Sequence, residues 1–141
     1  AILRQAMRDL GLAPAVVLVS TARRTMETLE ALEPWDDTPL IEPMDSLYLA
    51  NPMQLSAALH GVAETVRHLL VIGHNPGLHE LALMLTGSGH DDALRLLAGN
   101  LPTSGLIVID FDIDNWGDIA FRQGRLMQFV SPKLLRQTSD D

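Results

Sequence analysis

The stretch AVVLVSTARRTMET, residues 15–28, decides the fold class. Its first five residues are continuous, apolar and mostly β-branched, which is typical of a strand that is buried on both faces of a parallel sheet. Polar residues follow at once, and the spacing of Met26 and Leu29 predicts an amphipathic helix over residues 21–33. A buried strand that leads directly into a helix indicates an α/β protein.

This pattern of strand and helix continues along the chain. HLLVI, residues 68–72, is a second buried-strand signal, and a helix with proline in its first turn is expected over residues 76–86. The other expected helices cover residues 1–10, 52–65 and 91–98, and the other expected strands cover residues 106–113 and 125–130. Residues 35–51 form a long irregular connection in which Ile41 marks a short strand. We therefore predict a mostly parallel central sheet with helices on both faces and a C-terminal antiparallel hairpin.

Length and composition limit the class of protein. A chain of 141 residues fits one domain, and 47% hydrophobic with 20% charged residues is ordinary globular composition, which excludes intrinsic disorder. No apolar run approaches the ~20 residues of a membrane-spanning helix. The chain has no cysteine, so thiolate chemistry is excluded, and we expect a cytoplasmic protein. Its net charge of −8 disfavours general nucleic-acid binding, and an anionic substrate would need a local basic pocket.

Arg23 and Arg24 lie in the first turn of the helix that follows the first strand. Positive side chains are misplaced there, because a helix N-terminus already carries partial positive charge. Backbone N–H groups, the helix dipole and a guanidinium together suit a phosphate-like anion. The alternative is that both arginines are simply exposed to solvent.

A second polar strand end is Gly73-His74-Asn75-Pro76-Gly77, residues 73–77. The strand and the following helix place His74 at the carboxyl edge of the sheet, where open α/β sheets bind ligands. A histidine there can donate a hydrogen bond to an anion or transfer a proton. The alternative is a histidine that bonds a backbone group of the turn. Two strand ends with such side chains beside a helix start favour the functional interpretation.

The other polar residues give weaker signals. No metal site is expected, because the remaining histidines lack metal-ligand spacing. These histidines are His60, His68, His79 and His90. Glu42 and Asp45 lie in the long connection, where one of them is a candidate proton donor, although solvated loop carboxylates are the simpler interpretation. Thr103 and Ser104 open the third strand and would either line the same sheet edge or serve in a turn.

Three segments resemble the histidine phosphatase superfamily, and most of all its SixA-type phosphohistidine phosphatase branch. VVLVSTARRTMET, residues 16–28, is similar to the family's strand followed by Ser-x-Ala-x-Arg-x-x-x-Thr. VIGHNPGLHELALMLTG, residues 71–87, is similar to the second-histidine motif of this branch. LPTSGLIVIDFDIDNW, residues 101–116, and RLMQFVSPKLL, residues 125–135, resemble its C-terminal hairpin. The resemblance implies one phosphoglycerate mutase-like domain.

One part of the family pattern has no counterpart in the 141 residues. Members of the family begin with a strand that ends in Arg-His-Gly or a close relative, and that histidine takes the phosphoryl group. The Arg67-His68 pair does not match, because it precedes a strand instead of ending one. The resemblance therefore implies a nucleophilic histidine upstream of Ala1, on a buried strand that we expect in the middle of the sheet.

The resemblance implies a phosphatase that acts through a phosphohistidine intermediate, on phosphohistidine in a protein or on a small phosphate ester. It assigns catalysis to Arg24 and His74, with Asp45 as the candidate proton donor and without metal or cofactor. The residues that it places around the phosphate are Arg24 rather than Arg23, His74, Asn75 and Ser20. The alternatives are a catalytically inactive module that binds phosphate esters or a phosphoprotein, and a phosphoglycerate mutase-like transferase. An Arg-His upstream would favour the enzyme over the inactive module.

Overall fold

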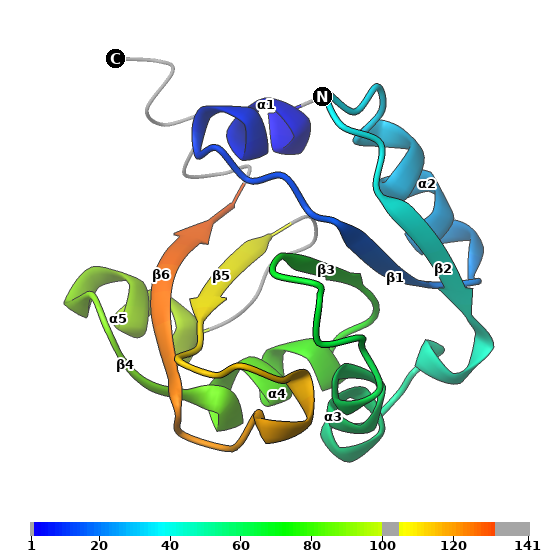
Figure 1. The fold of residues 1–141 in the computed structure, drawn as a ribbon. Coiled ribbons are helices and arrows are strands. Elements are labelled where there is room, and N and C mark those ends of the chain that lie inside the picture. Colours follow the sequence, from blue (N-terminus) through cyan, green and yellow to red (C-terminus); the bar gives the residue numbers. More distant parts are fainter. Residues whose placement is uncertain (1, 100–104, 132–141) are drawn as a thin grey trace, which may run out of the picture.

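A parallel three-stranded sheet forms one half of the fold, which a computed structural model describes for residues 2–99 and 105–131 (Figure 1). The order of its strands is β2-β1-β3. The strands are β1 (Val16–Ser20), β2 (Leu40–Met44) and β3 (Leu69–Ile72). Every residue of the central strand β1 is buried, as the continuous apolar run predicts. Thr103 and Ser104, which we considered for the sheet edge, lie outside the described residues.

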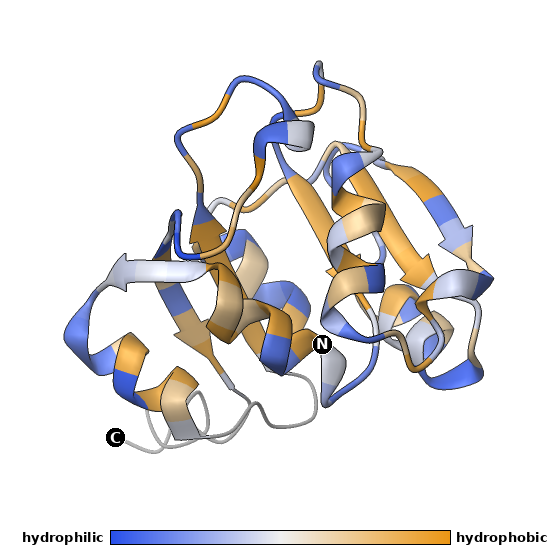
Figure 2. Cartoon of the chain, turned by 90° about the horizontal axis from the view of Figure 1, so that it is seen from below, coloured by the Kyte–Doolittle hydropathy of each residue, from blue (hydrophilic) through white to orange (hydrophobic). Residues whose placement is uncertain are grey.

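Helices cover both faces of this parallel sheet, as the sequence predicts. Alternate residues of β1 point to opposite faces, so that Val17 and Val19 share one core cluster while Val16 and Leu18 belong to another. The first cluster includes residues of α1 (Ile2–Asp9) and α2 (Arg23–Ala31), and the second includes residues of α3 (Pro52–His60) and α4 (Gly77–Leu85). Figure 2 shows the sheet between these helices and the largely hydrophobic character of its strands.

A second sheet of three strands has the order β4-β6-β5. β5 (Leu106–Asp110) and β6 (Gly124–Val130) form the expected antiparallel hairpin, and β4 (Thr86–Gly89) pairs with β6 in parallel. Helix α5 (Asp91–Gly99) packs on this sheet, and its Leu97 meets the fully buried Leu126 of β6 in a third core cluster. The hairpin and the parallel sheet together confirm the predicted fold class.

Some of the predicted boundaries are wrong. The third helix ends at His60 instead of residue 65, because Gly61 caps it and turns follow. Strand β5 ends at Asp110 instead of residue 113. Beyond it, Phe111 and Ile113 pack against the core on the α3 and α4 side of β1, and this packing draws the chain away from β6.

Strand β4 was not predicted, since its sequence Thr-Gly-Ser-Gly carries no β-branched apolar run. Its backbone approaches the segment before β6 so closely that a Cβ on Gly87 would lie 1.8 Å from the carbonyl oxygen of Arg122. Only glycine permits this approach. Backbone contact, which leaves little trace in side-chain patterns, therefore holds β4 in place.

A cavity of about 560 Å³ lies between the two sheets. Residues 66–70, which include the first two residues of β3, line one side of it, and residues 106–111 of β5 and its extension line another. Both strands are outer strands of their sheets within residues 2–99 and 105–131. β3 is apolar throughout, yet Leu69, Leu70 and Val71 are only half-buried. The expected single central sheet is thus divided at an apolar gap between two strand edges.

Candidate active site

The carboxyl ends of β1 and β3 lie next to each other, because the two strands pair in parallel with Val19 opposite Ile72. β1 ends at Ser20, and β3 is followed directly by Gly73 and His74. His74 Nε2 lies 2.8 Å from Ser20 Oγ, within hydrogen-bond distance. The two polar strand ends that the sequence singles out therefore meet at one place.

The segment that follows β1 is fixed by its own hydrogen bonds. The backbone N–H of Ala22 donates to Ser20 Oγ at 3.3 Å. The buried hydroxyl of Thr25 lies 2.7 Å from the carbonyl oxygen of Ser20 and 2.8 Å from that of Ala22. Ser20 itself is completely buried, so its hydroxyl contacts His74 and this turn and not solvent.

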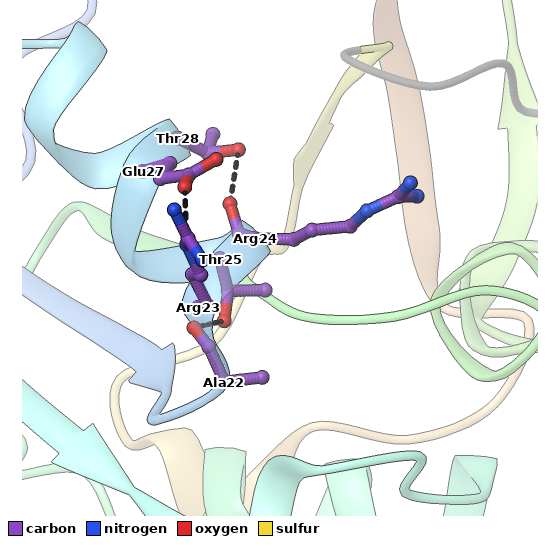
Figure 3. A network of polar contacts seen from close by, with 6 residues as sticks. All are labelled: Ala22, Arg23, Arg24, Thr25, Glu27 and Thr28. Atoms are coloured by element: carbon purple, nitrogen blue, oxygen red, sulfur yellow. Dashed lines mark hydrogen bonds and ion pairs between the residues drawn. The ribbon is translucent and has the colours of Figure 1, made fainter.

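Arg23 and Arg24 point in different directions (Figure 3). Arg23 Nε donates to Glu27 Oε1 at 3.0 Å along the outer face of α2, and its side chain is 92% exposed. Arg24 extends away from that pair, and its guanidinium has no ion pair or hydrogen bond to any residue that the structure describes. Of the two arginines, Arg24 therefore has a charge that is available to a ligand.

The N-terminus of α2 lies beside Arg24 and receives no side-chain cap. Ala22 occupies the N-cap position, and the first turn of the helix contains no acidic residue. The N–H groups of this first turn are consequently left for a ligand or water, and they add to the positive potential of the guanidinium.

Asp45 lies at the same edge of the sheet, one strand further out. It begins the short 3₁₀ turn η1 (Asp45–Leu47) directly after β2, and Met44 at the end of β2 pairs with Ser20. Thr21 Oγ1 donates to Asp45 Oδ1 at 2.5 Å. Glu42, the other carboxylate of the long connection, is paired with Leu18 halfway along the outer strand β2. The structure therefore brings Asp45, and not Glu42, to the edge that carries His74.

The loop after η1 is pressed against the start of α4. A Cβ on Gly77 would lie 2.1 Å from the carbonyl oxygen of Ala50, so only glycine allows the loop to pack there. Asn75 Oδ1 accepts a hydrogen bond from the backbone N–H of His79 at 3.3 Å, across the first turn of α4. The segment that carries His74 is thus anchored to α4 and to the loop.

Sequence reasoning missed Tyr48, which directly follows η1. Its ring packs edge-on against the imidazole of His74, with the ring centroids 5.3 Å apart and the planes at 81°. Tyr48 is also 59% exposed, so it forms an outer wall of the site. Its place in the irregular connection gives no periodic signal, and only the parallel pairing of β2 with β1 brings it to His74.

The other histidines that the structure describes have different surroundings. His60 Nε2 lies 3.0 Å from the carbonyl oxygen of Ile119, and His79 Nε2 lies 2.6 Å from that of Leu97. His68 precedes β3, at the opposite end of that strand from His74. Within residues 2–99 and 105–131, no three His, Cys, Asp or Glu side chains come together as metal ligands. No helix in those ranges has the length and apolar character of a membrane span.

Comparison with known proteins gives relatives of similar length. No family model matches the chain. The chain is 31% identical to the protein ML1117 of Mycobacterium leprae over an alignment of 123 residues, which covers 85% of this chain and 74% of that protein. It is 33% identical to Rv1276c of Mycobacterium tuberculosis over an alignment of 139 residues, which covers 90% of this chain and 85% of that protein. Both relatives are described as uncharacterized proteins.

Solved structures extend this comparison. A protein of Agrobacterium tumefaciens assigned as phosphohistidine phosphatase SixA is 27% identical, with a TM-score of 0.70 over 93% of this chain and 76% of its own. The corresponding protein of Nakamurella multipartitia is 22% identical, with a TM-score of 0.77 over 94% and 80% of the two chains. A protein histidine phosphatase SixA in complex with tungstate is 22% identical, with a TM-score of 0.71 over 95% and 79%. These structures share the fold of this chain, and the fold confirms the resemblance to the SixA-type branch of the histidine phosphatase superfamily.

Proposed function

We propose that this protein is a phosphatase that hydrolyses its substrate through a phosphohistidine intermediate. The observation that carries the proposal is the contact of His74 with Ser20 at the sheet edge where β1 leads into α2, whose uncapped first turn contains Arg24. The substrate class is phosphohistidine in a protein or a small phosphate ester. The SixA structure that holds tungstate supports this class, because tungstate is a tetrahedral oxyanion with the shape of phosphate.

Each group has a distinct task in this proposal. The guanidinium of Arg24 and the N–H groups of α2 bind the equatorial phosphoryl oxygens. His74 donates a hydrogen bond to an oxygen whose negative charge grows in the transition state. Asn75 lies on the same segment as His74 and completes the phosphate-binding set. Ser20, which the family resemblance also places in that set, acts on the phosphate through its contact with His74.

The nucleophile of the proposed reaction is a histidine outside the 141 residues. We place it at the end of a strand from upstream in the protein, inserted into the cavity between β3 and β5. Such a strand would form backbone hydrogen bonds with the open edges of both sheets. It would also cover the half-buried apolar residues of β3. Neighbouring strands lie about 4.8 Å apart, so a residue that ends this strand would reach the site one strand spacing from Gly73 and His74.

The reaction then takes two steps. In the first, an imidazole nitrogen of the nucleophile attacks phosphorus, a nitrogen–phosphorus bond forms, and the bond from phosphorus to the leaving group breaks. Asp45, when protonated, gives its proton to that leaving group. In the second step water attacks the phosphohistidine, which releases inorganic phosphate and restores the free imidazole. A substrate that is itself phosphohistidine depends less on Asp45, because imidazole is a better leaving group than an alkoxide.

A trapping experiment on the full-length protein tests this proposal. The protein is mixed with a phosphohistidine peptide or with p-nitrophenyl phosphate and quenched in alkali. The protein is then separated from the substrate and tested for covalently bound phosphate that is stable in base and labile in acid. We expect such a covalent intermediate and release of inorganic phosphate from at least one substrate. Binding of phosphate or vanadate with neither intermediate nor turnover would instead identify the inactive phosphate-binding module.

A further inference from the structure

The imidazole of His74 has two neighbours with defined contacts, and they act on different parts of the ring. Ser20 Oγ lies 2.8 Å from Nε2, and the ring of Tyr48 packs edge-on at 5.3 Å between centroids. The other nitrogen, Nδ1, has no hydrogen-bond partner among the residues that the structure describes. Nδ1 is therefore the nitrogen that remains for a ligand.

The surroundings of Ser20 determine which nitrogen of His74 carries the proton. Ser20 is completely buried, so its hydroxyl proton needs an acceptor inside the protein. The N–H of Ala22 is a donor and already occupies one lone pair of Ser20 Oγ. His74 Nε2 is the acceptor within reach. If the Ser20 hydroxyl donates to Nε2, the neutral imidazole carries its proton on Nδ1.

Backbone packing on both sides holds Tyr48 in place. Leu47 and Ala50 are buried, with exposed fractions of 1% and 5%, and the carbonyl of Ala50 sits against Gly77. Leu49 between them has a φ of +49°, in the left-handed region that residues other than glycine seldom adopt. Tyr48 and Leu49 consequently point outward from a fixed turn. The ring of Tyr48 is thus held against His74 by the turn and opposes a flip of the imidazole, which would put Cε1 in place of Nε2 beside Ser20.

We propose that Ser20 and Tyr48 are positioning residues that hold His74 as its Nδ1–H tautomer, with Nδ1 as the donor to a phosphoryl oxygen. The tautomer follows from the contacts of the free protein, and only the donation to phosphate rests on the proposed function. In this arrangement His74 is a hydrogen-bond donor without taking up a further proton. The site is then ready for an oxyanion before the substrate arrives.

Nitrogen NMR of the full-length protein tests the tautomer without any substrate. Long-range ¹H–¹⁵N correlation spectra of the neutral imidazole show which nitrogen carries the proton. We expect His74 to be the Nδ1–H form in the wild-type protein, and Ser20→Ala to shift it toward the Nε2–H form. Ser56→Ala, which removes another buried serine hydroxyl in α3, is the matched control and should leave His74 unchanged. A wild-type His74 in the Nε2–H form overturns the proposal, even if Ser20→Ala fails to fold.

Kinetics and spectra of Tyr48 variants test the positioning role. Tyr48→Phe keeps the ring and should stay within about twofold of the wild-type kcat, whereas Tyr48→Leu should lower kcat by about tenfold with little change in KM. Phe121→Leu, which removes an exposed aromatic ring elsewhere, is the matched control. Equal kcat values for the Phe and Leu variants would refute the role of the ring.

The two proposals can fail separately. If the protein shows no turnover, the proposed phosphatase function fails, but the spectra still decide the role of Tyr48. The ring-current shift of the His74 protons should persist in Tyr48→Phe and vanish in Tyr48→Leu, together with the single tautomer. A His74 that keeps one tautomer in Tyr48→Leu overturns the positioning role of Tyr48.

Discussion

Replacing Gly77 by alanine should destabilise the protein, although alanine is the better helix former. Gly77 is the first residue of α4, and the Gly→Ala change by itself favours a helix by at most about 1 kcal/mol. Against this gain, the new Cβ would lie 2.1 Å from the carbonyl oxygen of Ala50 and 3.3 Å from its carbonyl carbon. Both atoms belong to the backbone, so the loop itself must move by about 1 Å to reach ordinary contact distance.

The cost of that movement decides the sign of the effect. Overpacking a tight contact costs about 1–3 kcal/mol, and here the displaced atoms belong to a turn anchored by the buried Leu47 and Ala50. A clash with backbone atoms belongs to the upper part of that range, about 2–3 kcal/mol, so we expect Gly77→Ala to lower the free energy of unfolding by about 1–2 kcal/mol after a helix gain of about 1 kcal/mol is subtracted. Because the same turn carries Tyr48, the variant should also weaken the ring contact with His74.

Urea denaturation of the full-length protein measures this change, and Gly99→Ala is the matched control. Gly99 is the last residue of α5, and no atom of residues 2–99 and 105–131 is recorded within 4 Å of the Cβ that an alanine would add there. Gly99→Ala should therefore be neutral or slightly stabilising. The steric reasoning would be refuted by a Gly77→Ala protein that is as stable as the wild type and whose free energy of unfolding depends on urea concentration as steeply as that of the wild type.

Three further predictions concern the chemistry of the site. Arg24→Ala should remove phosphate or vanadate binding in calorimetric titration, while Arg23→Ala should change it little, because Arg23 is paired with Glu27. Equal losses of binding in the two variants would contradict the assignment of Arg24 as the phosphate ligand. His74→Ala should lower kcat on a phosphohistidine peptide by about 10²-fold without lowering the melting temperature, and near-normal activity in a stable variant would exclude a catalytic role. Asp45→Asn should slow release of an alkoxide from a phosphate monoester by about 10²-fold but leave phosphohistidine hydrolysis nearly unchanged, and parallel losses on both substrates would argue against proton donation.

The sequence predicts the elements that depend on continuous apolar patterns. β1 and β3 are runs of Val, Leu and Ile that fill both faces of a sheet, so their place and their helical neighbours can be read directly. Parallel pairing then brings Ser20 and His74 together, because residues that follow such strands share one edge. The core of the candidate site was predictable for this reason.

The remaining features depend on contacts that a single sequence does not record. β2 contains Glu42 and Pro43 and has no clear apolar alternation, so its register, which carries Asp45 and Tyr48 to the site, could not be derived. β4 is held by close backbone approach at Gly87. The family resemblance led us to expect a further strand in the middle of the sheet, but side-chain patterns do not show that the edges left open for it are those of β3 and β5.

The acidity of the whole chain does not oppose an anion site, because electrostatic effects at this edge of the sheet are local. The net charge is −8, but at physiological salt exposed charges more than about 8 Å apart are largely screened from each other. The anion would therefore experience mainly the groups at the strand ends: Arg24, the first N–H groups of α2, His74 and the negatively charged Asp45. Since Arg24 is the one full positive charge in that set, its removal would leave Asp45 facing the phosphate with only hydrogen-bond dipoles to offset it. This balance is why we expect Arg24→Ala to abolish oxyanion binding and not merely to weaken it.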